Sequence, residues 1–179
     1  MPVKTEWFDR PGGEPVELHQ PSDRWLEVAQ TWSNAIVGVL APLQPRVEHV
    51  GSTAVPGLIA KPVIDLQVSV RDLADEPAYR PGLESLGLVL RAREPERRFF
   101  RHPAGEPRVV HVHVCSQGSK WEREHLLFRD QLRARPELVV VYAQLKLDLQ
   151  HRVGWDRFAY TEGKTDFIRQ VIQAADSAT

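Results

Sequence analysis

The sequence lacks the features that would place a protein in a membrane or outside the cell. Its longest apolar run, at residues 138–143, is far shorter than the ~20 residues that a transmembrane helix needs. The opening residues, MPVKTEWFDR, lack the apolar core of a signal peptide. A single cysteine, Cys115, excludes an intrachain disulfide and suits a reducing compartment. We therefore expect a cytoplasmic protein without a membrane partner.

The sequence also lacks an excess of positive or negative charge. The chain carries 23 Lys and Arg against 24 Asp and Glu, a formal net charge of −1. No overall field therefore attracts a polyanion such as nucleic acid. The arginine-rich segment 91–101 is interrupted by Glu94 and Glu96, as is typical of a solvated surface. We expect no nucleic-acid partner.

The length predicts one domain over residues 1–179, with room for a sizeable core. Residues 1–15 hold three prolines and two glycines, which predict an irregular lead-in. Apolar segments predict strands at residues 16–19, 46–50, 63–70, 88–90, 97–101 and 109–114. Apolar residues at three- and four-residue steps predict helices at residues 22–40, 77–86, 119–135, 136–151 and 165–175. The fold class is then α/β (α+β), a mixed sheet with helices packed on it and a helical C-terminal third.

Several helix starts carry local signals. Ser22 is the expected N-cap of the first helix, and Pro136 suits the first position of the helix that it opens. Residues 160–164 are expected to lead into the last helix, with Thr165 or Asp166 as its cap.

A small-residue turn and a strand-borne carboxylate form the most informative pattern in the chain. Gly51, Ser52 and Thr53 end a short strand, and the backbone N–H groups of such a turn can cradle a phosphate. Asp65 on the next strand can hold a divalent cation against that phosphate. This is the outline of a nucleotidyltransferase active site, which usually has a second acid at position 67. Gln67 stands there, so we assign the catalytic positions to Asp65 and Gln67 without a second negative charge.

A second strand repeats this geometry with imidazoles. Alternation places Asp65 and Gln67 on one face of their strand, and His111 and His113 on one face of theirs. We expect these faces to meet across neighbouring strands. Asp65, His111 and His113 would then bind a divalent metal, either Mg or Mn, or Zn or Fe, which accept imidazole more readily than Mg does. Alternatively, the histidines donate to a substrate phosphate or are half-exposed on the sheet.

Five further residues are candidates for binding a phosphorylated substrate. Lys61 begins the strand of Asp65, and Lys164 follows a glycine near a helix start, although no P-loop glycine precedes it. His125 and Arg129 share a helix face and could clamp a phosphate, or they form a solvated polar face. Tyr160 could stack on a base.

Longer blocks of the sequence closely resemble the GrpB family, which is placed in the nucleotidyltransferase superfamily. The resemblance runs from about residue 47 to 168 and rests on GSTAVPGLIAKPVIDLQVSV (51–70), HVHVC (111–115), HLLFRDQLR (125–133) and YTEGKTDFI (160–168). It implies a nucleotidyltransferase fold and a site around Gly51 and Asp65. GrpB-like domains also occur fused to dephospho-coenzyme A kinase, which makes a coenzyme A-related ligand conceivable.

Three functions fit these residues. The first is nucleotidyl transfer from a nucleoside triphosphate to an acceptor, with a divalent metal. The second is a binding module for a nucleotide or phosphorylated small molecule, because catalysis with two metals requires at least two carboxylates. The third is a metalloprotein that uses His111, His113 and Asp65.

Overall fold

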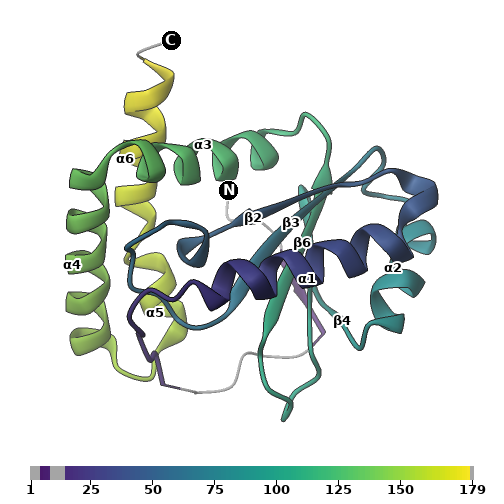
Figure 1. The fold of residues 1–179 in the computed structure, drawn as a ribbon, viewed down its shortest axis with the longest axis horizontal. Coiled ribbons are helices and arrows are strands. Elements are labelled where there is room, and N and C mark those ends of the chain that lie inside the picture. The colour runs from purple at the N-terminus through teal and green to yellow at the C-terminus, as the bar shows by residue number, and fades with distance from the viewer. Residues whose placement is uncertain (1–4, 9–14, 178–179) are drawn as a thin grey trace.

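The computed structural model describes residues 5–8 and 15–177. Its six-stranded mixed sheet has the order β1-β4-β5-β6-β3-β2 (Figure 1). Only β3 and β6 pair in parallel, and the other neighbours are antiparallel. The strands are β1 (Glu6–Trp7), β2 (Arg46–Val50), β3 (Ile64–Val70), β4 (Val89–Glu94), β5 (Arg97–Arg101) and β6 (Val110–Ser116).

The register between β3 and β6 sets the two faces of the sheet. Asp65 lies opposite His111 and Gln67 opposite His113, so all four project to the same side. The intervening residues of both strands are buried in the main hydrophobic core on the other side: Ile64, Leu66, Val68, Val110, Val112 and Val114. The predicted meeting of the two polar faces is confirmed.

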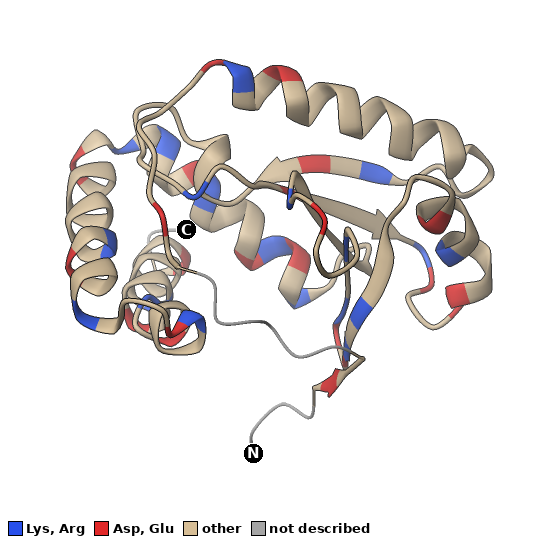
Figure 2. Ribbon diagram, turned by 90° about the horizontal axis from the view of Figure 1, so that it is seen from below, with Lys and Arg blue, Asp and Glu red and all other residues tan. Residues whose placement is uncertain are grey.

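Two helices cover the apolar side of the sheet. α1 (Arg24–Val39) lies along it, and its charged residues are confined to its first turn (Figure 2). α2 (Glu76–Ser85) follows β3 and contributes Tyr79 and Leu83 to the same core. A short 3₁₀ helix, η1 (Ala41–Leu43), ends the α1 segment.

The C-terminal part is helical, as predicted. It contains α3 (Lys120–Ala134), α4 (Pro136–Val153), α5 (Arg157–Glu162) and α6 (Thr165–Asp176), and α4, α5 and α6 gather at one end of the molecule (Figure 1). Ser119 caps α3 by accepting a hydrogen bond from the N–H of Glu122 at 3.2 Å. A second hydrophobic cluster joins α3 and α4 to the connector after η2 (Ser52–Ala54) through Leu132, Tyr142, Val55 and Leu58.

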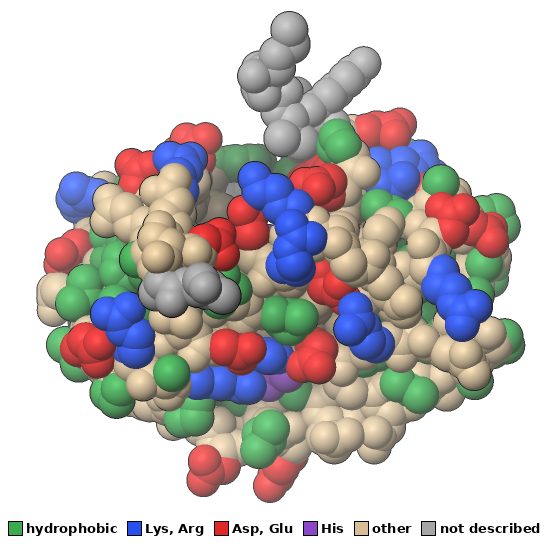
Figure 3. Space-filling model, turned by 90° about the horizontal axis from the view of Figure 1, so that it is seen from above, with side chains coloured by type: hydrophobic (Ala, Val, Ile, Leu, Met, Phe, Trp, Pro, Cys, Tyr) green, Lys and Arg blue, Asp and Glu red, His purple; other side chains and the backbone are tan. Residues whose placement is uncertain are grey.

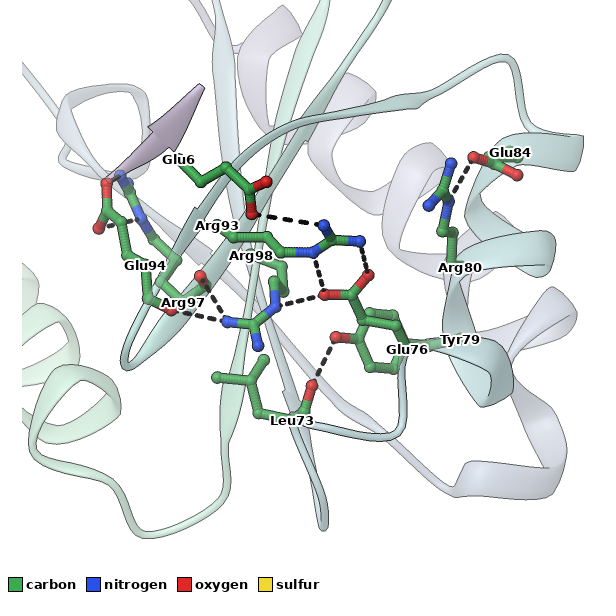
Figure 4. Close-up of polar contacts among 10 residues, drawn as sticks. All are labelled: Glu6, Leu73, Glu76, Tyr79, Arg80, Glu84, Arg93, Glu94, Arg97 and Arg98. Carbon is green, nitrogen blue, oxygen red and sulfur yellow. Dashed lines mark hydrogen bonds and ion pairs between the residues drawn. The ribbon is translucent and has the colours of Figure 1, made fainter. Parts of the chain in front are cut away.

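An ion-pair network ties α2 to the far edge of the sheet (Figure 4). The Glu76 carboxylate accepts two hydrogen bonds from Arg93, at 2.6 and 2.7 Å, and a third from Arg98 at 2.6 Å. Arg93 also contacts Glu6 at 3.4 Å and therefore links β1 to this network. These bonds hold the pKa of Glu76 below its usual range, with Arg93 as the largest cause.

Four local predictions are wrong. The lead-in contains β1, which pairs with β4, while residues 1–4 and 9–14 lie outside the described part. Residues 16–19 form one bridge, between His19 and Ala60, because Val16 packs on the C-terminal helices instead of on a strand. The N-cap of α1 is Asp23, not Ser22.

The fourth error concerns the segment before α6. Residues 157–162 form α5, which Asp156 caps by accepting from the N–H of Ala159 at 2.9 Å. Lys164 then occupies the N-cap position of α6, in place of Thr165 or Asp166. The Asp156 cap is the sequence signal that marks this short helix.

The surface carries mixed charge. Over α3 and α6, Lys and Arg side chains are interleaved with Asp and Glu (Figure 3). Within the described part of the chain, no helix combines the length and apolar character that crossing a membrane requires.

Candidate functional site

A cavity of about 300 Å³ opens beside Asp65 on the polar side of the sheet. It brings together residues from the turn after β2, from β3, β5 and β6, and from the C-terminal helices. Eight predicted site residues line it: Ser52, Thr53, Lys61, Asp65, His111, His113, Tyr160 and Lys164. Trp7, Arg97, Phe99 and Lys146 line it too and were not predicted.

The turn at Gly51 lies directly against Asp65. Gly51 has a φ of +70°, and a Cβ atom there would be 2.6 Å from Asp65 Oδ2. Only glycine fits both the left-handed backbone and this close approach. Next to it, Thr53 is fixed by His49, whose Nε2 lies 2.9 Å from the Thr53 hydroxyl. Burial lowers the pKa of His49 to about 4, so this imidazole is neutral near pH 7.

Asp65 is ionised and held by two imidazoles. Its Oδ1 lies 3.2 Å from Nε2 of His113 and 3.4 Å from Nδ1 of His111. Burial alone would raise the pKa of Asp65, but the hydrogen bonds to His111 and His113 prevail and hold it well below its usual range.

Arg97 decides the tautomer of His113. A guanidinium can only donate, so His113 Nδ1, at 3.1 Å from Arg97 Nη1, is an acceptor. The ring proton is therefore on Nε2, which donates to Asp65. Burial and the charge of Arg97 lower the pKa of His113, which keeps it neutral. Phe99 stacks on its ring with centroids 5.1 Å apart.

Lysines surround Tyr160 on the other side of the cavity. The Nζ atoms of Lys61 and Lys164 lie 5.4 and 4.7 Å from its ring centroid. Tyr160 is only 1% exposed, which leaves little of its ring for the predicted stacking on a base.

Lys146 is a site residue that the sequence reasoning missed. It is 2% exposed, its ammonium donates to the carbonyl oxygen of Ile59, and it lies over the ring of Tyr142 at 4.9 Å. Burial, with the nearby Lys164 and Lys61, lowers its pKa to about 7. The signal was present: Lys146 occupies the apolar stripe of α4 between Tyr142 and Leu149.

Four predicted site residues are not among those that line the cavity. One of them, Gly51, lies directly against Asp65, and the side chains of the other three do not reach the cavity. Gln67 is fully buried, and neither atom of its amide has a hydrogen-bond partner among the described residues. The catalytic role predicted for Gln67 therefore has no structural basis. Arg129 pairs with Glu48 and Asp130, each at 2.7 Å, and His125 stacks on the ring of Trp121 at 3.5 Å. The predicted phosphate clamp of His125 and Arg129 is not formed, because Arg129 is held by Glu48 of β2 and by Asp130, and His125 is stacked on Trp121.

The donor set does not fit the divalent metal that the resemblance implies. Among the described residues, Asp65 is the one carboxylate that lines the cavity, because position 67 holds a buried amide. Both histidines are directed at that carboxylate. Magnesium sites in nucleotidyl transfer rest on several oxygen ligands. Within residues 5–8 and 15–177, no group of three or more His, Cys, Asp or Glu has an arrangement that could hold a metal ion. The metal centre predicted from Asp65, His111 and His113 is thus a hydrogen-bonded triad in the structure.

Comparison with known proteins places the chain in a family. The family profile described as GrpB protein matches residues 15–174, nearly the whole chain. The chain belongs to the GrpB family. The UPF0157 protein SCO7215 of Streptomyces coelicolor is 39% identical over 91% of this chain and 86% of its own length. A dephospho-CoA kinase of Mycolicibacterium paratuberculosis is 30% identical over 90% of this chain, which spans 46% of that protein.

Solved structures agree with this assignment. The GrpB protein of Enterococcus faecalis superposes with a TM-score of 0.78 at 28% identity, over 89% of this chain and 96% of that one. The Cid1 poly(U) polymerase superposes with a TM-score of 0.52 at 12% identity, over 74% of this chain and 43% of that one. The second likeness shows that this GrpB protein has a nucleotidyltransferase-like fold.

Proposed function

We propose that this GrpB protein binds a nucleotide or another phosphorylated small molecule in the cavity beside Asp65. The observation that carries the proposal is the convergence of the Ser52 turn with Lys61 and Lys164 on one cavity. Hydroxyl groups and ammonium groups are the usual partners of phosphate oxygens. A neutral His113 and an ionised Asp65 complete a polar wall on the opposite side.

A thermal-shift titration tests this proposal. Nucleoside triphosphates, nucleoside monophosphates and coenzyme A are each titrated, with and without magnesium, and at least one is expected to raise the Tm by linkage. Coenzyme A is included because of the similarity to part of a dephospho-CoA kinase.

Two glycine variants test whether the ligand binds beside Asp65. Gly51→Ala is expected to abolish the shift, because its Cβ would displace Asp65. Gly57→Ala is the matched control: its φ of +76° imposes similar backbone strain, but the added Cβ meets nothing within 4 Å. Absence of a shift with every ligand, or an equal loss in both variants, would contradict the proposal.

Nucleotidyl transfer is the second candidate, and the fold favours it. Cid1 is described as a poly(U) polymerase and is seen with MgATP. Release of pyrophosphate from a triphosphate, abolished by Asp65→Asn, would support transfer. Ligand binding without pyrophosphate release would support the binding module. This alternative is favoured because Asp65 is the one carboxylate lining the cavity in the described part of the chain.

A further inference from the structure

The cavity has a marked imbalance of charge. Among the described residues, three lysines line it, Lys61, Lys146 and Lys164, and Asp65 is the one carboxylate. A fourth cation of the lining, Arg97, is already paired with Glu94 at 2.6 Å. Asp65 already accepts hydrogen bonds from two histidines on the sheet side. Its negative charge raises the pKa of Lys164, but one carboxylate does not balance three ammonium groups.

The three lysines come from separate elements and meet around two tyrosine rings. Lys61 precedes β3, Lys146 is on α4 and Lys164 precedes α6. Lys61 and Lys164 lie over the ring of Tyr160, and Lys146 lies over the ring of Tyr142. Lys146 is buried and Lys61 and Lys164 are half-buried, so the three ammonium groups repel one another unless an anion accompanies them.

The pKa values of Lys164 and Lys146 agree with repulsion among the three ammonium groups. Burial, followed by repulsion from Lys61, lowers the pKa of Lys164 to about 8, although Asp65 opposes the effect. Burial, followed by repulsion from Lys164 and Lys61, lowers the pKa of Lys146 to about 7. The groups that face its ammonium are the ring of Tyr142 and the carbonyl of Ile59. An anion that enters the cavity would reverse both shifts.

We infer that the lysine cluster binds the polyphosphate end of a ligand without a divalent metal. This inference rests on the proposed function and names its ligand class: a chain of two or three phosphates, whose charge matches the cluster better than a monophosphate does. In this arrangement the ammonium groups supply the positive charge that a divalent metal would otherwise bring to the phosphates.

Calorimetric titration with inorganic tripolyphosphate tests the inference. In EDTA, at a pH near the lysine pKa values of about 7 and about 8, tripolyphosphate is expected to bind with uptake of protons. Comparing two buffers of different ionisation enthalpy detects that uptake. Excess magnesium is expected to weaken binding, because the metal neutralises the phosphate charge before it meets the lysines.

Charge-removing variants locate the interaction. Lys164→Gln and Lys146→Gln are each expected to weaken binding about 10- to 100-fold, as the loss of a charge-assisted hydrogen bond predicts. Lys120→Gln, whose side chain is 68% exposed on α3, removes the same charge elsewhere and should change nothing. Lys164 is less buried than Lys146, so its variant keeps the test valid if Lys146→Gln fails to fold.

Three results would overturn the inference. Binding of tripolyphosphate only in the presence of magnesium would show that a metal, and not the lysines, supplies the positive charge. Inorganic phosphate could bind as tightly as tripolyphosphate, or the two cluster variants could behave like Lys120→Gln. In each case, a thermal shift with another phosphorylated ligand would leave the proposed function intact, whereas loss of every shift would remove both.

Discussion

At the scale of single residues, the environment of Asp65 defines the site. Gly51 lies against one of its oxygens, and His111 and His113 contact the other. Arg97 fixes the proton of His113 on the nitrogen that faces Asp65. The carboxylate is therefore ionised and oriented before any ligand enters, which is the condition for a preorganised site.

Gln67 offers a test at the same scale. Its buried amide lacks partners among the described residues, so Gln67→Leu should raise the free energy of unfolding by about 1 kcal/mol. Gln67→Asp should lower it by roughly 3 kcal/mol, because it buries a carboxylate at a position with no exposure. Urea unfolding measures both changes. A Gln67→Asp variant as stable as the parent would show that this position is open to the cavity.

At the scale of elements, Glu76 anchors α2 to β4 and β5 (Figure 4). Glu76→Gln should lower the free energy of unfolding by about 3 kcal/mol, because Arg93 and Arg98 lose a common, largely buried partner. Glu84→Gln is the matched control on the same helix. Its pair with Arg80 is exposed, with side-chain exposures of 40% and 43%, so the cost should stay below about 0.5 kcal/mol. Equal costs in chemical denaturation would refute a structural role for the Glu76 network.

At the scale of the whole molecule, buried histidines make stability depend on pH. His49 has a pKa of about 4 in the folded protein and 6.5 as its ordinary value, so between these the unfolded chain binds more protons. The free energy of unfolding should therefore fall as the pH decreases from about 6.5 to about 4. The lowered pKa of His113 also makes the free energy of unfolding fall as the pH decreases. The lowered pKa of Glu76 extends this loss of stability to lower pH.

Thermal unfolding over this pH range measures the effect. His49→Gln should flatten the profile, and His151→Gln, on the exposed side of α4, should leave it unchanged. A parent profile that is level across this range would show that His49 is accessible to protons in the folded state.

The sequence by itself determined the sheet side of the site. Side-chain alternation is a local property of a strand, so the order of residues determined that Asp65 and Gln67 share one face and that His111 and His113 share another. The pairing of β3 with β6 then brought the two faces together. The turn at Gly51 could also be predicted, because a glycine followed by two small polar residues is a local pattern in the sequence. The fold class was also determined, because apolar periodicity and family motifs cover most of the chain.

Only the tertiary structure decided the helix side of the cavity. Lys146 and Lys164 meet Lys61 because α4 packs on α3, α5 and the connector after η2, and α6 packs on α3. No local pattern specifies such contacts. The packing of α3 on β2 and β6 directed Arg129 to Glu48, and Gln67 is fully buried in the folded molecule. A residue's neighbours in space depend on how distant elements pack, so the lysine cluster became visible only in the folded molecule.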